Sequence, residues 1–166
     1  MSIAQSLLPE FDIEMAATRA VLERVPADRM DWRPHERSFT LGELATHVAR
    51  LPEWTVATLA HDSFDLEGAE SAAGGEVAAD PAARLDETAS AARQALLDAE
   101  DDAFMGMWTL QRGGEEIFSA PKIGVLRRFV LNHMIHHRGQ LTVYLRLLDV
   151  PVPQTFGPTA DEPDFN

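Results

Sequence analysis

Residues 129–148 read FVLNHMIHHRGQLTVYLRLL and indicate how the chain folds. Apolar residues recur there every three or four positions, which predicts an amphipathic helix. His133 and His137 stand one turn apart, so a helix places both imidazoles on one face. At about 100° of rotation per residue, both rings fall in the middle of the apolar stripe that should face the core. Buried imidazoles need polar partners, and one transition-metal ion would serve both.

His136 and the arginines of this helix fall outside the middle of the stripe. His136 lies at its rim, about 60° from His133, and is expected to be a rim or solvent residue rather than a ligand. The arginines in this segment and directly before it are all expected to project away from the stripe. They are Arg127, Arg128, Arg138 and Arg146.

Four helical segments can be recognised from spacing and from start and stop signals. Their expected bounds are residues 3–25, 40–61, 80–100 and 121–148. The first ends before Pro26. The second begins at Thr40, with Glu43 three residues later in a capping-box pattern, and Pro52 should kink or divide it. The third begins with Asp80 as its N-cap and a proline at the first helical position.

The segments between the helices contain turn-forming residues and little periodicity. Residues 62–80 are acidic and rich in Gly and Ala, so they are expected to form a long surface loop. The Gly113-Gly114 pair predicts a short hairpin before the last helix. Residues 150–166 contain four prolines and no periodicity, so they are expected to form an irregular tail that folds back over one end of the bundle. The expected fold is all-α: one domain over residues 1–166, an up-down-down-up four-helix bundle with a long crossover loop.

Composition excludes several classes of function. The chain has 166 residues and a net charge of −13, which argues against sequence-independent nucleic-acid binding because phosphates would repel it. It has no cysteine, so disulfides, thiolate ligands and a cysteine nucleophile are excluded. No signal peptide and no membrane-spanning apolar run is recognisable, and a soluble cytoplasmic protein without a membrane partner is expected.

The candidate third ligand is His47, on the second predicted helix. It borders an apolar arc formed by Leu44, Val48 and Leu51, so its ring can point inward. Glu43, one turn earlier, could accept the second N–H of a ligating imidazole, or could serve only as the carboxylate of the capping box. From the residues alone, three histidines that merely form hydrogen bonds within the core remain an alternative to a metal site.

Three segments together resemble the DinB-like family of metal-binding four-helix bundles, which includes the YfiT-type proteins. They are WRPHERSFTLGELATHVARLPEW, LNHMIHHRGQLTVYLRLL and VPVPQTFGPTADE, and the likeness extends over nearly the whole chain. The family's metal triad takes one histidine from the second helix and two from an HxxxH on the fourth. Those positions match His47, His133 and His137 here.

The resemblance also implies a divalent metal, zinc or nickel, and a homodimer. One face of the last helix fits association of two copies, because it carries small or apolar residues opposite the histidines, at about 160–240° on the wheel. These residues are Leu131, Ile135, Gly139 and Thr142. The alternative is that loops or the tail of the same chain cover this face.

Three protein ligands would leave open positions on the metal, as in catalytic zinc sites. By resemblance, the leading hypothesis is a thiol-dependent transferase that binds a low-molecular-weight thiol and presents it to a small electrophile. The first alternative is a metal-dependent hydrolase, with a carboxylate or His136 as general base. The second is a non-catalytic stress-response protein with a structural metal.

Overall fold

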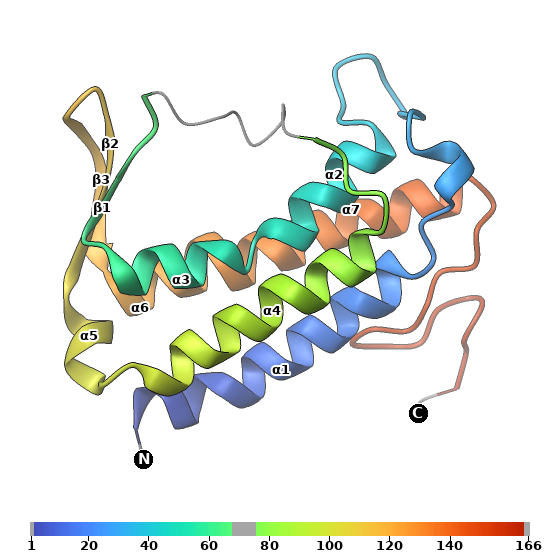
Figure 1. Cartoon of the computed structure of the whole chain (residues 1–166). Helices are drawn as coiled ribbons and strands as arrows, with labels where there is room; N and C mark the ends of the chain where they lie inside the picture. Colours follow the sequence, from blue (N-terminus) through green and yellow to red (C-terminus); the bar gives the residue numbers. More distant parts are fainter. Residues whose placement is uncertain (1, 68–75, 165–166) are drawn as a thin grey trace.

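Four helical segments lie side by side in the computed structural model, which describes residues 2–67 and 76–164 (Figure 1). They are α1 (Ile3–Leu22), α2 (Leu41–Arg50) continued by α3 (Glu53–Ala60), α4 (Pro81–Asp98), and α6 (Lys122–Val125) continued by η2 (Leu126–Asn132) and α7 (His133–Leu147). α1 packs against α4 and α7, and α2 packs against the same two helices. The four segments therefore surround one apolar core. α1 and α7 run in one direction, and α2, α3 and α4 run in the other (Figure 1).

Local capping signals set where the helices begin. The Thr40 hydroxyl accepts from the Glu43 amide at 3.1 Å, and the Glu43 carboxylate accepts from the Thr40 amide at 2.7 Å. This capping box satisfies two backbone donors at the start of α2. Pro52 separates α2 from α3, and Asp80 caps α4 with Pro81 at its first position. These three predictions are confirmed.

A three-stranded sheet covers one end of the bundle, so the all-α expectation is corrected to a mostly helical fold (Figure 1). The strands, in sheet order, are β1 (Ser63–Asp65), β2 (Met107–Arg112) and β3 (Glu115–Pro121). The predicted hairpin is present between β2 and β3. Gly113 and Gly114 form its two-residue turn and adopt the positive φ angles, 60° and 81°, that such a turn requires. Short helices η1 (Ala27–Arg29) and α5 (Asp101–Met105) complete the described elements.

Strand β1 contradicts the expectation of one continuous loop over residues 62–80. Its three residues pair in parallel with β2, with Phe64 opposite Leu110. The Asp65 carboxylate accepts from the Gly113 and Gly114 amides at 2.9 Å each, which ties β1 to the hairpin turn. Three residues are too few for a period-two pattern to be recognised. The rest of the predicted crossover loop includes residues 68–75, which lie outside the described residues.

The buried side of α7 is wider than a single stripe, and it is centred away from the histidines. Met134, Leu141 and Leu145 are fully buried, and they lie at about 80–120° from His133 on the wheel. His133 and His137 are only partly buried, so they lie at the edge of this arc rather than in its middle. The difference arises because α7 packs against both α1 and α2. The prediction from the helical wheel assumed that only one face of this helix is buried.

The segment η2 is π-helical and leads directly into α7. Hydrogen bonds in such a segment run from i to i+5, so each turn holds one more residue than an α-helical turn. The sequence predicts Leu131 on the outward face of the helix if every residue advances by the α-helical rotation. Leu131 is 3% exposed and belongs to the core, which corrects that placement. Ile135 and Gly139 are exposed, and the association of two copies through this face stays a prediction.

A buried ion pair joins α7 to α1. The Arg138 guanidinium donates to the Glu14 carboxylate at 2.7 Å, to the Glu14 carbonyl at 3.2 Å and to the Thr18 hydroxyl at 3.1 Å. Both charged side chains are less than 10% exposed. The expectation that Arg138 projects into solvent is therefore wrong. The side of α7 that the wheel left to solvent packs against α1, where Glu14 supplies the opposite charge.

We expect Glu14→Ala to lower the free energy of unfolding by about 3–5 kcal/mol, because it leaves the Arg138 charge buried without a partner. Urea unfolding followed by circular dichroism measures the effect. The double variant Glu14→Leu with Arg138→Met removes both charges and should recover most of the stability. An unchanged unfolding midpoint in Glu14→Ala would show that the pair does not stabilise the fold.

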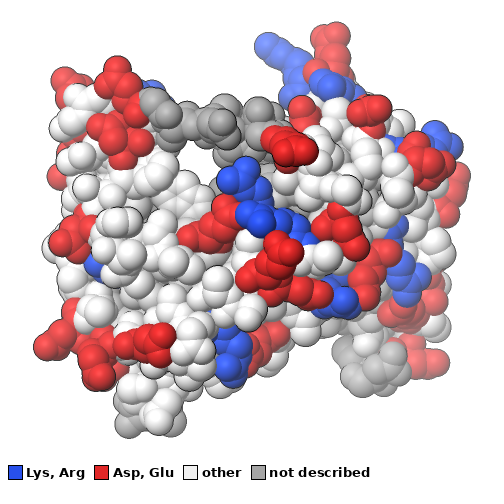
Figure 2. Space-filling view, in the orientation of Figure 1, with Lys and Arg blue, Asp and Glu red and all other residues white. Residues whose placement is uncertain are grey.

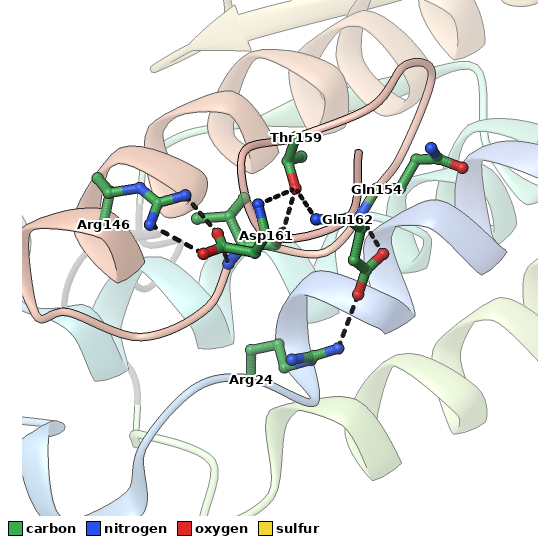
Figure 3. Close-up of polar contacts among 7 residues, drawn as sticks. Arg24, Arg146, Gln154, Thr159, Asp161 and Glu162 are labelled. Carbon is green, nitrogen blue, oxygen red and sulfur yellow. Dashed lines mark hydrogen bonds and ion pairs between the residues drawn. The ribbon is translucent and has the colours of Figure 1, made fainter. Parts of the chain in front are cut away.

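The C-terminal tail folds back along α1 and α7, and a polar network holds it there (Figure 3). The Asp161 carboxylate forms an ion pair with Arg146 of α7 and accepts from the Val152 amide at 2.8 Å. Glu162 accepts from Arg24 at 3.0 Å and from the Gln154 amide at 2.7 Å. The tail is irregular, as predicted. It also covers the buried ion pair, since the Phe156 ring lies 5.2 Å from the Arg138 guanidinium.

Hydrogen bonding to Arg146, and secondarily to the Val152 amide, lowers the pKa of Asp161 below its ordinary value of 3.8. The folded pKa lies below the unfolded one, so this contact stabilises the docked tail above about pH 4. The stabilisation is lost as pH falls through the lowered folded pKa. Titration of the Asp161 carboxyl carbon by NMR should give a midpoint below 3.8, and Arg146→Gln should raise that midpoint. Equal midpoints in the two proteins would contradict the assignment.

Among the described residues, no helix combines the length and apolar character that crossing a membrane requires.

Candidate metal centre

The three predicted histidines meet between α2 and α7. His47 lies on α2, and His133 and His137 lie one turn apart on α7. The Nε2 atom of His133 is 2.9 Å from Nε2 of His137 and 3.4 Å from Nε2 of His47. One potential ligand atom from each ring lies within 4.8 Å of the others, so the three could hold one metal ion. His47 and His133 are partly buried, so the cluster lies at the edge of the core.

The His137 ring is oriented through its other nitrogen. For His133, burial lowers the pKa, and the Phe129 backbone partly offsets this by raising it. The Nδ1 atom of His137 is 2.7 Å from Oε1 of Gln140, which accepts its proton. The Nε2 atom of His137 faces the centre, so a proton on Nδ1, directed at Gln140, leaves the Nε2 lone pair turned inward. This is the tautomer that metal-ligating imidazoles adopt when an outer partner holds them.

The chemistry of this donor set fits a metal cation. Two imidazole nitrogens 2.9 Å apart share a hydrogen bond if one of them carries a proton, and when both are unprotonated they can bind a cation together. Neutral imidazole nitrogens suit Zn, Ni, Cu and Fe, whereas Mg and Ca prefer oxygen ligands. The residues therefore fit a transition metal, held by His47, His133 and His137.

The electrostatic surroundings keep the three rings neutral and ready to bind a cation. Burial, followed by the nearby His137 and His133, lowers the pKa of His47 from 6.5 to about 4. Burial also lowers the pKa values of His133 and His137. Among the described groups, no carboxylate contributes to any of these shifts. The one other cation that acts on His47 is Arg50, whose Nε donates to Glu53 at 3.2 Å.

An aromatic wall closes one side of the cluster. Phe39, just before the cap of α2, stacks on His47 with ring centroids 6.1 Å apart, and its edge contacts the His137 ring at 6.4 Å. The Tyr144 hydroxyl of α7 donates to the Phe39 carbonyl at 3.2 Å, which fixes the connector against the helix. Trp32 packs edge-on against Tyr144 at 5.6 Å. The connector between α1 and α2 thus shields the imidazoles on this side.

The two other candidate residues have distinct places. The Glu43 carboxylate accepts from the Thr40 amide in the capping box, and it forms no hydrogen bond with an imidazole among the described residues. His136 is exposed, and its ring centroid is 4.8 Å from that of His137, so it lies at the rim of the cluster.

Sequence reasoning missed Gln140 and Phe39. Gln140 could have been found, because it follows His137 by three residues and so lies on the same face of the helix. Phe39 carried no signal, since it lies in a connector whose path depends on contacts with Tyr144.

The chain belongs to the DinB family, whose model matches residues 1–164. It is 27% identical over 158 residues to the uncharacterized protein YrdA of Bacillus subtilis strain 168, covering 93% of this chain and 89% of that protein.

Two solved structures share the fold. A DinB-like protein from Bacillus cereus ATCC 10987 has a TM-score of 0.71 at 19% identity, covering 92% of this chain and 97% of that one. The DinB-like protein YjoA from Bacillus subtilis has a TM-score of 0.69 at 15% identity, covering 90% and 97%.

We expect His133→Ala to abolish stoichiometric metal binding, because the Nε2 atom of His133 lies closest to both other ligand atoms. Elemental analysis of purified protein after loading with zinc or nickel measures the metal content. His136→Ala is the matched control, since it removes an adjacent imidazole at the rim and should leave the content unchanged. Full metal content in His133→Ala would exclude the three-histidine site.

Proposed function

We propose that the protein is a metal-dependent transferase that joins a low-molecular-weight thiol to a small electrophile. The observation that carries this proposal is the convergence of three imidazole nitrogens within 4.8 Å of one another at the edge of the core. A divalent ion, zinc or nickel, would supply Lewis-acid chemistry there, which lowers the pKa of a thiol or water bound beside it. His47, His133 and His137 hold the ion in this proposal.

The neighbouring residues orient the imidazole rings and shield them from solvent. Gln140 holds the His137 ring through its Nδ1 atom, so the orientation of this ligand is set before a metal or a substrate binds. Phe39 covers one side of the cluster and restricts access of water from that direction. A small molecule would therefore approach from the opposite, open side.

In the described part of the chain no carboxylate is bonded to the imidazoles, and this favours a thiol over water as the nucleophile. Metal-dependent hydrolysis benefits from a general base within hydrogen-bond reach of the attacking water. Among the described residues, no carboxylate forms a hydrogen bond or ion pair with the three imidazoles, and Glu43 is used by the cap of α2. A thiol that has already lost its proton needs no base at the moment of attack. The chain has no cysteine, so the sulfur comes from a cosubstrate.

Hydrolysis remains the second candidate because of one observation, the position of His136. Its ring lies 4.8 Å from that of the ligand His137, it is exposed, and it could take a proton from water at the centre. A non-catalytic role in stress response, with the metal purely structural, is the remaining alternative.

The test uses the zinc-loaded and the nickel-loaded protein with a panel of small thiols. Monochlorobimane serves as the electrophile, and ester and amide substrates are offered separately. We expect conjugation above the uncatalysed rate, because the metal raises the thiolate fraction at neutral pH. His133→Ala should lose this activity, and His136→Ala should keep it.

The other outcomes of the panel overturn the proposal in different ways. Hydrolysis of an ester or amide that His136→Ala abolishes, with no conjugation, would identify a hydrolase. Neither reaction in protein with full metal content would favour the binding role.

A further inference from the structure

Arg128 differs from most cations of this acidic chain because it has no acidic partner. Ten Lys and Arg side chains form ion pairs with described carboxylates, and the face in Figure 2 shows such basic and acidic side chains interspersed. Arg128 is exposed and forms neither an ion pair nor a hydrogen bond with any residue of 2–67 or 76–164. An unpaired guanidinium in a chain of net charge −13 is available to an external anion.

Two aromatic rings hold this guanidinium in place. Its central carbon lies 4.7 Å from the ring centroid of Phe118 on β3 and 5.4 Å from that of Phe129 on η2. The two rings meet edge to face, with centroids 5.4 Å apart. When a guanidinium stacks on an aromatic ring, its flat face makes the contact. The N–H groups, which point outward in its plane, can still donate hydrogen bonds. Arg128 is therefore restrained by the fold while its donors stay available.

Arg128 precedes the metal centre on the same helix. Arg128 and His133 are five residues apart across the π-helical segment η2, where the i to i+5 pattern places the backbones of such residues one turn apart. The Phe129 ring, which the Arg128 guanidinium contacts, comes from the same turn. The backbone of Arg128 thus lies one helical turn before His133.

We infer that Arg128 binds a carboxylate of the small molecule on which the metal centre acts. A planar guanidinium fork matches the two oxygens of a carboxylate. A phosphate carries nearly two negative charges, and a single cation in a strongly acidic protein is a poor match for it. The substrate class is accordingly a small carboxylate-bearing molecule, with its reacting group at the metal and its carboxylate at Arg128. This assignment rests on the proposed function, since it takes the metal centre as the place where the small molecule reacts.

The first test compares two thiols in zinc-loaded protein by calorimetry, 3-mercaptopropionate with a carboxylate and 2-mercaptoethanol without one. We expect the carboxylate thiol to bind about tenfold more tightly, because a charge-assisted hydrogen-bond pair is added. The preference should disappear in Arg128→Gln. It should persist in Arg127→Gln, the adjacent exposed arginine, whose nearest carboxylate is that of Glu10 at 3.8 Å. Arg128→Lys should retain part of it, since the charge remains but the fork is lost.

A preference that is equal in Arg128→Gln and the unaltered protein would overturn the assignment. Binding of neither thiol would count against the thiol proposal, and a second measurement then decides on Arg128 alone. Metal-free protein is treated with phenylglyoxal, and modification at each arginine is followed by mass spectrometry. Benzoate should slow modification of Arg128 and leave Arg127 unaffected. Equal rates at Arg128 with and without benzoate would refute carboxylate binding there.

Discussion

The buried ion pair between Arg138 and Glu14 sets the rotation of α7 about its own axis, and the metal centre depends on that rotation. A buried guanidinium must keep its carboxylate, so α7 can turn little without leaving a charge unpaired. Arg138 follows His137 directly in the sequence. Holding Arg138 against α1 therefore holds the adjacent imidazole at the opposite edge of the buried arc, facing α2. Phe156 of the docked tail covers the pair from outside.

The other half of the centre is fixed by local backbone chemistry. The capping box sets where α2 begins, and hence on which side His47 emerges seven residues after Thr40. Tyr144 then binds the connector through the Phe39 carbonyl, which places an aromatic ring on His47. The imidazoles on both helices are thus positioned by contacts outside the three-histidine cluster. Such preorganisation is what allows a small site on two helices to bind a cation tightly.

The structural features that could be predicted from the sequence are those encoded by neighbouring residues. The HxxxH spacing, the cap at Thr40, the break at Pro52 and the Gly113-Gly114 turn are each encoded within a few residues, and the structure contains all of them. Features that depend on distant partners were missed. Arg138 was assigned to solvent because nothing near it in sequence reveals Glu14, which is 124 residues away. Strand β1 was missed for a similar reason, since its pairing partner lies beyond α4.

The π-helical segment η2 has a consequence for how the chain can change in length. Its wider turn holds one residue more than an α-helical turn, immediately before His133. Deleting one residue within η2 would allow regular α-helix to form, which is the easier backbone to build. Because the π turn already holds one extra residue, the helical segments on its two sides would keep nearly the same angular positions after such a deletion. A one-residue deletion in the regular α-helix of α7 would instead turn the residues on one side of it by about 100° relative to the other side. Single-residue deletions should therefore be tolerated better in η2 than in α7.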